Sequence, residues 1–202
     1  ALVASRVLLP ADGDFPPNRW REVVDGITPF LDRGVVGLGF IERVSRADLP
    51  ALERRRQESG QRDFRAERKG SEDPAYIVTH IEPLARNRPA LGKDVGSGVT
   101  RRSAAEEAMR TGNAVLTKTI QVIEAGGKVP GSLLFLPVYR AGESVTTAEE
   151  RTRALRGWVY ASLRMDLLLR SVLTDTDGQV NLHVYERDQN DRERLVFASV
   201  DD

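Results

Sequence analysis

The second half of the chain is constrained most strongly by the shortness of the connections between its extended segments. Alternating apolar and polar residues predict extended segments over 113–127 and 131–142, which GGKVPG connects. They predict two more over 179–187 and 194–202, which DQNDRE connects. A parallel crossover needs a dozen residues or more, so connections of this length favour antiparallel hairpins. The sequence therefore predicts an antiparallel sheet.

The first half of the chain alternates helical and extended patterns. Apolar residues at helical spacing predict a helix over 18–31, whose last turns Pro29 should distort, and a second helix over 45–60. The remaining predicted elements are strands over 33–44, 63–68, 76–83 and 157–164, helices over 100–112 and 165–175, and a polar connection of partly helical character over 142–153. This order indicates an α+β fold, an antiparallel sheet flanked by helices.

Composition excludes several classes of protein. Hydrophobic residues make up 40% of the 202 residues, which is enough to bury a core, and the formal net charge of zero argues against a nucleic-acid-binding face. The chain has no cysteine, so disulfides and thiolate metal sites are excluded. No apolar stretch reaches the roughly 20 residues that span a bilayer, and the start lacks both Met and a signal peptide pattern. We expect an excised region of a longer protein.

Motifs for catalysis or metal binding are weak. The two histidines, His80 and His183, stand on separate predicted strands without the spacing of a zinc site. There is no GxSxG elbow and no P-loop, and the glycines of GVVGLGF (34–40) run into a strand instead of opening a helix, which argues against a dinucleotide loop. No cofactor is predicted.

Glu82 and Asp94 differ from the other carboxylates, because they lie beside apolar or backbone-restricting residues and not on a charged helix face. As an acid/base pair they would suit a hydrolase, but no third group is evident to hold a nucleophile or an oxyanion. A carboxylate at the mouth of an apolar pocket can instead accept hydrogen bonds from a ligand. Asp94 also has a structural interpretation, as a cap or turn residue between Gly92 and Gly96.

Four segments together are similar to one known family. They are YIVTHIEPLARNRPALGKDVGS (76–97), RRSAAEEAMRTGNAVLT (101–117), GSLLFLPVYRAG (131–142) and LRGWVYASLRMDLLL (155–169). In this order and spacing they resemble the CHASE domain, and the match runs from about Val35 to Asp202.

The resemblance implies the fold and the function. CHASE domains are extracellular or periplasmic sensors between two transmembrane helices, attached to histidine kinases, diguanylate cyclases or related outputs, and the plant members are cytokinin receptors. The chain should then have a long N-terminal helix in a helical segment over 1–33, followed by tandem PAS-like modules. These are a membrane-distal ligand-binding domain over 34–162 and a membrane-proximal segment over 163–202. The fragment itself should not be an enzyme.

The resemblance also implies ligand-binding residues. Asp94 matches an aspartate that hydrogen-bonds the adenine ring of cytokinin, Leu116 matches a pocket position, and Thr111 matches a threonine required for cytokinin perception. Leu136 stands where the plant receptors have a phenylalanine, and Ala125 replaces a threonine that contacts the ligand. The expected ligand is therefore adenine-like or another small metabolite.

Further pocket candidates come from the strands. Alternation along the strand 76–83 predicts that Tyr76, Val78, His80 and Glu82 share one face, and that face points either to the pocket or to solvent. Leu134, like Leu116 and Leu136, is a pocket candidate with a plain core position as the alternative, and Thr111 has helix capping as its alternative.

The expected mechanism follows from this family. A ligand that contacts Asp94 would bias one of two domain arrangements, and the N-terminal helix and C-terminal hairpin would convey the change to the membrane helices. Such receptors signal as homodimers, and the apolar face of the helix 18–31 either forms the dimer seam or packs on its own domain. The alternative function is a CHASE-like module that senses a protein partner and binds no small molecule.

Overall fold

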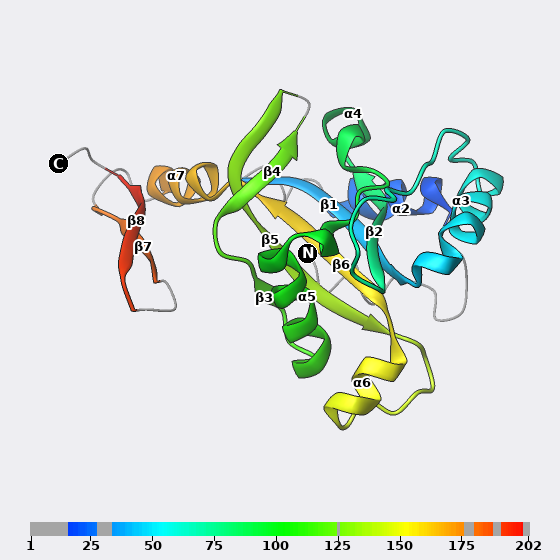
Figure 1. Ribbon diagram of the computed structural model, residues 1–202. Coiled ribbons are helices and arrows are strands. Elements are labelled where there is room, and N and C mark those ends of the chain that lie inside the picture. Colours follow the sequence, from blue (N-terminus) through cyan, green and yellow to red (C-terminus); the bar gives the residue numbers. More distant parts are fainter. Residues whose placement is uncertain (1–15, 28–33, 125, 176–179, 188–190, 200–202) are drawn as a thin grey trace.

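The computed structural model describes residues 16–27, 34–124, 126–175, 180–187 and 191–199 (Figure 1). The helices are α2 (Pro17–Ile27), η2 (Arg46–Asp48), α3 (Leu49–Glu58), α4 (Leu84–Asn87), η3 (Arg88–Ala90), η4 (Val95–Ser97), α5 (Val99–Thr111), α6 (Ala148–Ala154) and α7 (Met165–Asp175), where η marks a 3-10 helix. The strands are β1 (Val35–Val44), β2 (Ala75–Glu82), β3 (Val115–Leu116), β4 (Ile120–Glu124), β5 (Gly127–Tyr139), β6 (Leu155–Leu163), β7 (His183–Arg187) and β8 (Glu193–Ala198). No described helix is long and apolar enough to cross a membrane.

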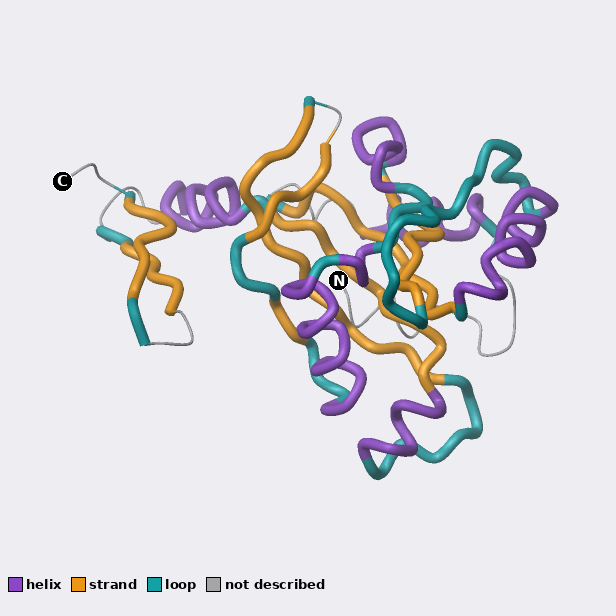
Figure 2. Tube along the Cα trace, viewed as in Figure 1, coloured by secondary structure: helices purple, strands orange, loops and turns teal. Residues whose placement is uncertain are grey.

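The main sheet is antiparallel, as the short connections predicted. Its strands lie in the order β2-β1-β6-β5-β3, and β4 pairs with β5. The hairpin β7–β8 forms a separate two-stranded sheet, and in Figure 1 it lies beyond α7 to one side of the main sheet. Figure 2 shows the strands of the main sheet at the centre, with helices around them. The α+β class is confirmed.

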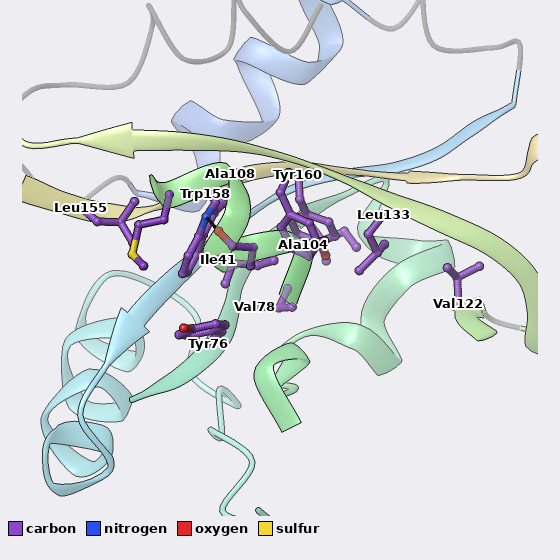
Figure 3. Packing of buried hydrophobic residues seen from close by; sticks show 14 residues of the cluster. Ile41, Tyr76, Val78, Ala104, Ala108, Val122, Leu133, Leu155, Trp158 and Tyr160 are labelled. Atoms are coloured by element: carbon purple, nitrogen blue, oxygen red, sulfur yellow. Dashed lines mark hydrogen bonds between the residues drawn. The ribbon is translucent and has the colours of Figure 1, made fainter. Parts of the chain in front are cut away.

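Each face of the main sheet packs against a different helix. On the α5 face, the Trp158 ring packs against the tilted ring of Tyr76 with centroids 4.6 Å apart, and its Nε1 donates to Ala105 O at 2.9 Å (Figure 3). On the opposite face, Trp20 and Val24 of α2 are buried among residues of β1 and β6. The apolar face of α2 therefore packs on its own domain, which is the alternative to a dimer seam. That the protein forms a homodimer stays a prediction, and we assign no surface of the domain to the dimer contact.

A β-bulge at Thr79 changes the face to which β2 directs its side chains. Phe40 pairs with His80 but Ile41 pairs with Val78, so the register shifts by one residue at Thr79. Val78 lies in the cluster beneath α5, whereas the His80 ring lies 5.9 Å from Trp20 on the α2 face. The prediction that Tyr76, Val78, His80 and Glu82 share one face was therefore wrong, because alternation does not continue through a bulge.

Two other expectations need comment. Residues 63–68 do not form a strand; Phe64 and Ala66 are buried in a loop that packs on α3 and Ile77. The predicted hairpin is present, but its loop is shorter than GGKVPG, because Lys128, Val129 and Pro130 already pair with β4. Of the predicted helix 18–31, residues 28–31 lie outside the described residues.

Gly92 fixes the loop that crosses the sheet between β2 and α5. Its φ is +80°, and a Cβ atom built on it would lie 2.0 Å from Arg65 O. Gly142 has a similar φ of +78° but nothing within 4 Å of its Cβ position. We expect Gly92→Ala to lower the free energy of unfolding by at least about 2 kcal/mol more than Gly142→Ala, because both changes strain φ but only the first collides with backbone. Urea denaturation of both variants tests this, and equal losses would contradict it.

Candidate ligand cavity

A cavity of about 300 Å³ lies on the α5 side of the main sheet. Its walls come from β2, β5 and β6, from the segment α4–η3–η4, and from the hairpin β4–β5. Figure 3 shows four of its apolar or aromatic side chains, Val78, Val122, Leu133 and Tyr160, which come from four different strands. Further lining residues are Ile81, Asn87, Ala90, Val95, Ile120 and Ser162. Apolar walls with a few polar groups are typical of small-molecule sites.

Charged side chains lie around the cavity and are mostly engaged by the protein. Lys93 Nζ lies 3.1 Å from Glu67 Oε1, and Arg101 Nη2 donates to Gln121 O at 3.0 Å. Burial lowers the pKa of Arg101 below its ordinary value. Lys128 is exposed. Within the described part of the chain, no group of three His, Cys, Asp or Glu side chains is arranged to hold a metal ion.

Two buried polar groups that line the cavity were not predicted. The Tyr160 hydroxyl and Asn87 Oδ1 are both buried without a hydrogen-bond partner among the residues that the structure describes. Two glycines of β1 make room for them: a Cβ atom on Gly39 would lie 2.5 Å from Tyr160 Cε1, and one on Gly37 would lie 3.1 Å from Asn87 Oδ1. Alternate glycines within the strand-like GVVGLGF were the available signal, because such glycines often mark a close approach of another group.

The Asp94 carboxylate is held by the protein itself. Its side chain is fully buried; Oδ2 accepts from Arg46 Nη2 at 2.6 Å, and Oδ1 accepts from the backbone N of Tyr76 at 3.0 Å and of Gly96 at 2.9 Å. The last bond makes Asp94 the N-cap of η4. Asp94 is among the residues that line the cavity, but all three donors to its carboxylate are protein groups.

The structure places three predicted site residues of β2, Tyr76, Val78 and His80, in three different environments. Val78 lines the cavity, whereas the Tyr76 hydroxyl donates to Glu106 Oε1 at 3.1 Å and its ring packs in the core. Burial and the nearby Glu106 carboxylate raise the pKa of Tyr76 to about 12. His80 lies on the other face, with Nε2 3.0 Å from Arg56 Nη1. Only Val78 of the three lines the cavity.

Of the remaining predicted site residues, those that the structure describes do not line the cavity. Leu116 is 46% exposed on β3, and Leu134 packs against the cluster on the α2 face. Leu136 is buried opposite Val159. Thr111 ends α5, where its hydroxyl donates to Glu107 O at 2.8 Å and accepts from Asn113 N at 3.3 Å, a local bonding pattern at the helix end. Ala125 lies outside the described residues.

We expect Asp94→Asn to destabilise the ligand-free protein. The change removes the charge that balances Arg46 and weakens two buried backbone contacts, so the free energy of unfolding should fall by about 3 kcal/mol. Arg68→Gln is the control, because it breaks a more exposed pair with Glu53 and should cost about 1 kcal/mol or less. Chemical denaturation measures the free energy of unfolding of both variants. A value for Asp94→Asn equal to that of the wild type would show that the contacts of the Asp94 carboxylate contribute little to stability.

Comparison with known proteins identifies a family. A family model described as the CHASE domain matches residues 14–197, nearly the whole chain. A search of curated proteins gave no significant match. The CHASE domain is a sensor domain of signalling receptors, so a sensor role follows for this chain.

Proposed function

We propose that the chain, which belongs to the CHASE domain family, is the small-molecule-sensing part of a transmembrane receptor. In this proposal the receptor is a bacterial histidine kinase or diguanylate cyclase, and the domain lies in the periplasm and transmits ligand occupancy across the membrane. The observation that carries the proposal is the cavity of about 300 Å³, whose walls come from segments far apart in the sequence. A ligand bound there would contact several elements at once.

The proposal covers the domain organisation as well. The main sheet ends at Leu163, and the hairpin β7–β8 forms its own sheet. These observations support a membrane-distal PAS-like domain over 34–162 and a membrane-proximal segment over 163–202. Of the predicted helical segment 1–33, the structure describes the helix α2, and residues 1–15 and 28–33 lie outside the described residues. We further propose binding without turnover, since the cavity carboxylates of Glu67 and Asp94 are engaged by protein donors.

A contact between the cavity wall and the C-terminal hairpin supports signal transmission. Thr119 precedes Ile120, a lining residue, and its backbone N donates to Glu186 Oε1 of β7 at 2.6 Å. Arg194 of β8 donates to the other oxygen at 2.6 Å. Displacement of β4 by a ligand would thus act directly on the hairpin.

The charge state of Glu186 makes this contact available at neutral pH. Partial burial alone would raise its pKa, but the hydrogen bond from Thr119 and the Arg194 guanidinium outweigh this and hold the pKa below its ordinary value of 4.5. Because the pKa is lowered by folding, the contact gives its full stabilisation above the unfolded-state pKa. That stabilisation is lost as pH falls through the folded-state pKa.

We expect Glu186→Ala to uncouple the hairpin from the cavity. Ligand affinity should stay within about twofold, because Glu186 does not line the cavity, but ligand-induced NMR shifts at Val184 and Tyr185 should disappear. In the wild-type protein the Thr119 amide shift should titrate with a midpoint below pH 4.5. Glu193→Ala is the control, because Glu193 pairs with Arg187 within the hairpin. Ligand-induced NMR shifts at Val184 and Tyr185 that persist in Glu186→Ala would contradict transmission through the Thr119–Glu186 contact.

We expect purified protein to bind small molecules in the cavity. A thermal-shift screen with nucleobase-like and amino-acid-like compounds should raise the melting temperature, and Ala90→Phe should abolish the shift because the new ring fills the cavity. Leu116→Phe is the matched control on an exposed position of β3. Loss with Leu116→Phe and not with Ala90→Phe would place the site elsewhere, and no binding at all would favour the protein-partner alternative.

A further inference from the structure

Asn87 presents a fixed acceptor to the cavity. Its side chain is 1% exposed, and its Nδ2 donates to Val36 O at 2.9 Å and to Pro83 O at 3.0 Å. Both amide hydrogens are therefore used, and the two carbonyls fix which end of the amide is nitrogen. Oδ1 is left buried, without a protein donor, at the cavity wall.

Tyr160 is a second lining residue with a buried polar atom, the hydroxyl. The residue is 2% exposed, and within the described part of the chain no group forms a hydrogen bond with its hydroxyl. Burial raises the pKa of Tyr160, so the phenol keeps its proton and can donate. The ring lies over Gly39 and the Asn87 amide over Gly37, which are consecutive positions on one face of β1. Ser162, which pairs with Gly37, adds a hydroxyl-bearing residue to the same wall.

Among the described residues, most of the charged side chains that line the cavity are already engaged by protein groups. Glu67 and Lys93 pair with each other, Asp94 pairs with Arg46, and Arg101 donates to a backbone carbonyl. Lys128, the other charged lining residue, is exposed. An ionised ligand group that reached Tyr160 and Asn87 would lose its hydration without gaining a partner of opposite charge. A neutral group would lose far less.

We propose that the cavity binds an uncharged ligand whose buried end carries an N–H donor next to a carbonyl acceptor, as in a primary amide or a lactam. The N–H donates to Asn87 Oδ1, the carbonyl accepts from the Tyr160 hydroxyl, and an apolar body packs on Val78 and Leu133. This inference rests on the proposed small-molecule function and specifies the class of ligand. Its physical basis is that both buried polar groups gain the hydrogen bonds that they lack.

The test compares four compounds that share a phenyl ring. Benzamide has donor and acceptor, N,N-dimethylbenzamide lacks the donor, benzoate is an anion and benzylamine is a cation. Dissociation constants from ligand-observed NMR at millimolar concentrations should be lowest for benzamide. Tyr160→Phe should raise the benzamide Kd at least about tenfold, the loss of one well-placed hydrogen bond. Its melting temperature without ligand should not fall, because the lost hydroxyl had no protein partner.

Tyr139→Phe is the matched control, because the Tyr139 hydroxyl donates to Met109 O at 2.7 Å and Tyr139 does not line the cavity. It should lower the melting temperature and leave the benzamide Kd unchanged. The inference is overturned if benzamide does not bind, if benzoate or benzylamine binds as tightly, or if Tyr160→Phe leaves the benzamide Kd unchanged. Where any compound's binding is lost with Ala90→Phe but not changed by Tyr160→Phe, the proposed sensor function stands and only the ligand class fails.

Discussion

The cavity depends on the buried carboxylate of Asp94, which joins three segments that the sequence keeps apart. It pairs with Arg46 after β1, accepts from the backbone of β2 at Tyr76, and caps η4 through Gly96. Hydrogen bonds to a charged group contribute about 1.5–3 kcal/mol each, and removal of one partner leaves a buried charge. The loop over the cavity therefore has a firm anchor at its C-terminal end, while Asn87 anchors its other end on Val36 and Pro83.

These anchors bear on the role that the family resemblance gives to Asp94. A ligand N–H that bonded to its carboxylate would compete with the Arg46 guanidinium or with two backbone donors that are already in place. A neutral ligand N–H forms a weaker bond than the guanidinium and one no stronger than a backbone N–H, so the exchange is unfavourable unless the ligand gains elsewhere. Tyr160 and Asn87 have no such competitor, since their free polar atoms lack a protein partner. In this chain the open hydrogen-bonding capacity lies at Tyr160 of β6 and Asn87 of α4, and not at Asp94.

The sequence could predict the strands and not the point where their alternation breaks. Antiparallel pairing followed from short connections, and Gly112 ends α5 with φ +78°, as its position indicated. His80 was misplaced because a bulge is set by pairing between β1 and β2, which periodicity in one strand does not record. Asn87 and Tyr160 were missed for a similar reason: each depends on a glycine of β1, and only the folded sheet brings them together. The family motif identified the loop correctly, but loop position alone could not decide what the carboxylate of Asp94 bonds.

Sensing requires that the ligand prefer one arrangement of the protein, because equal affinity for two states shifts neither. In the proposed function, the asymmetry of the cavity would meet this requirement. Its sheet wall is built from strands that pair in long ladders, whereas β4 pairs, among the described strands, with β5 alone. Contacts made to Ile120 and Val122 therefore act on the less restrained wall, and Thr119 connects that wall to Glu186. Each 1.4 kcal/mol of difference in ligand binding between two hairpin positions changes their ratio about tenfold, so in the proposed mechanism a few apolar ligand contacts on β4 would be enough to shift the C-terminal hairpin.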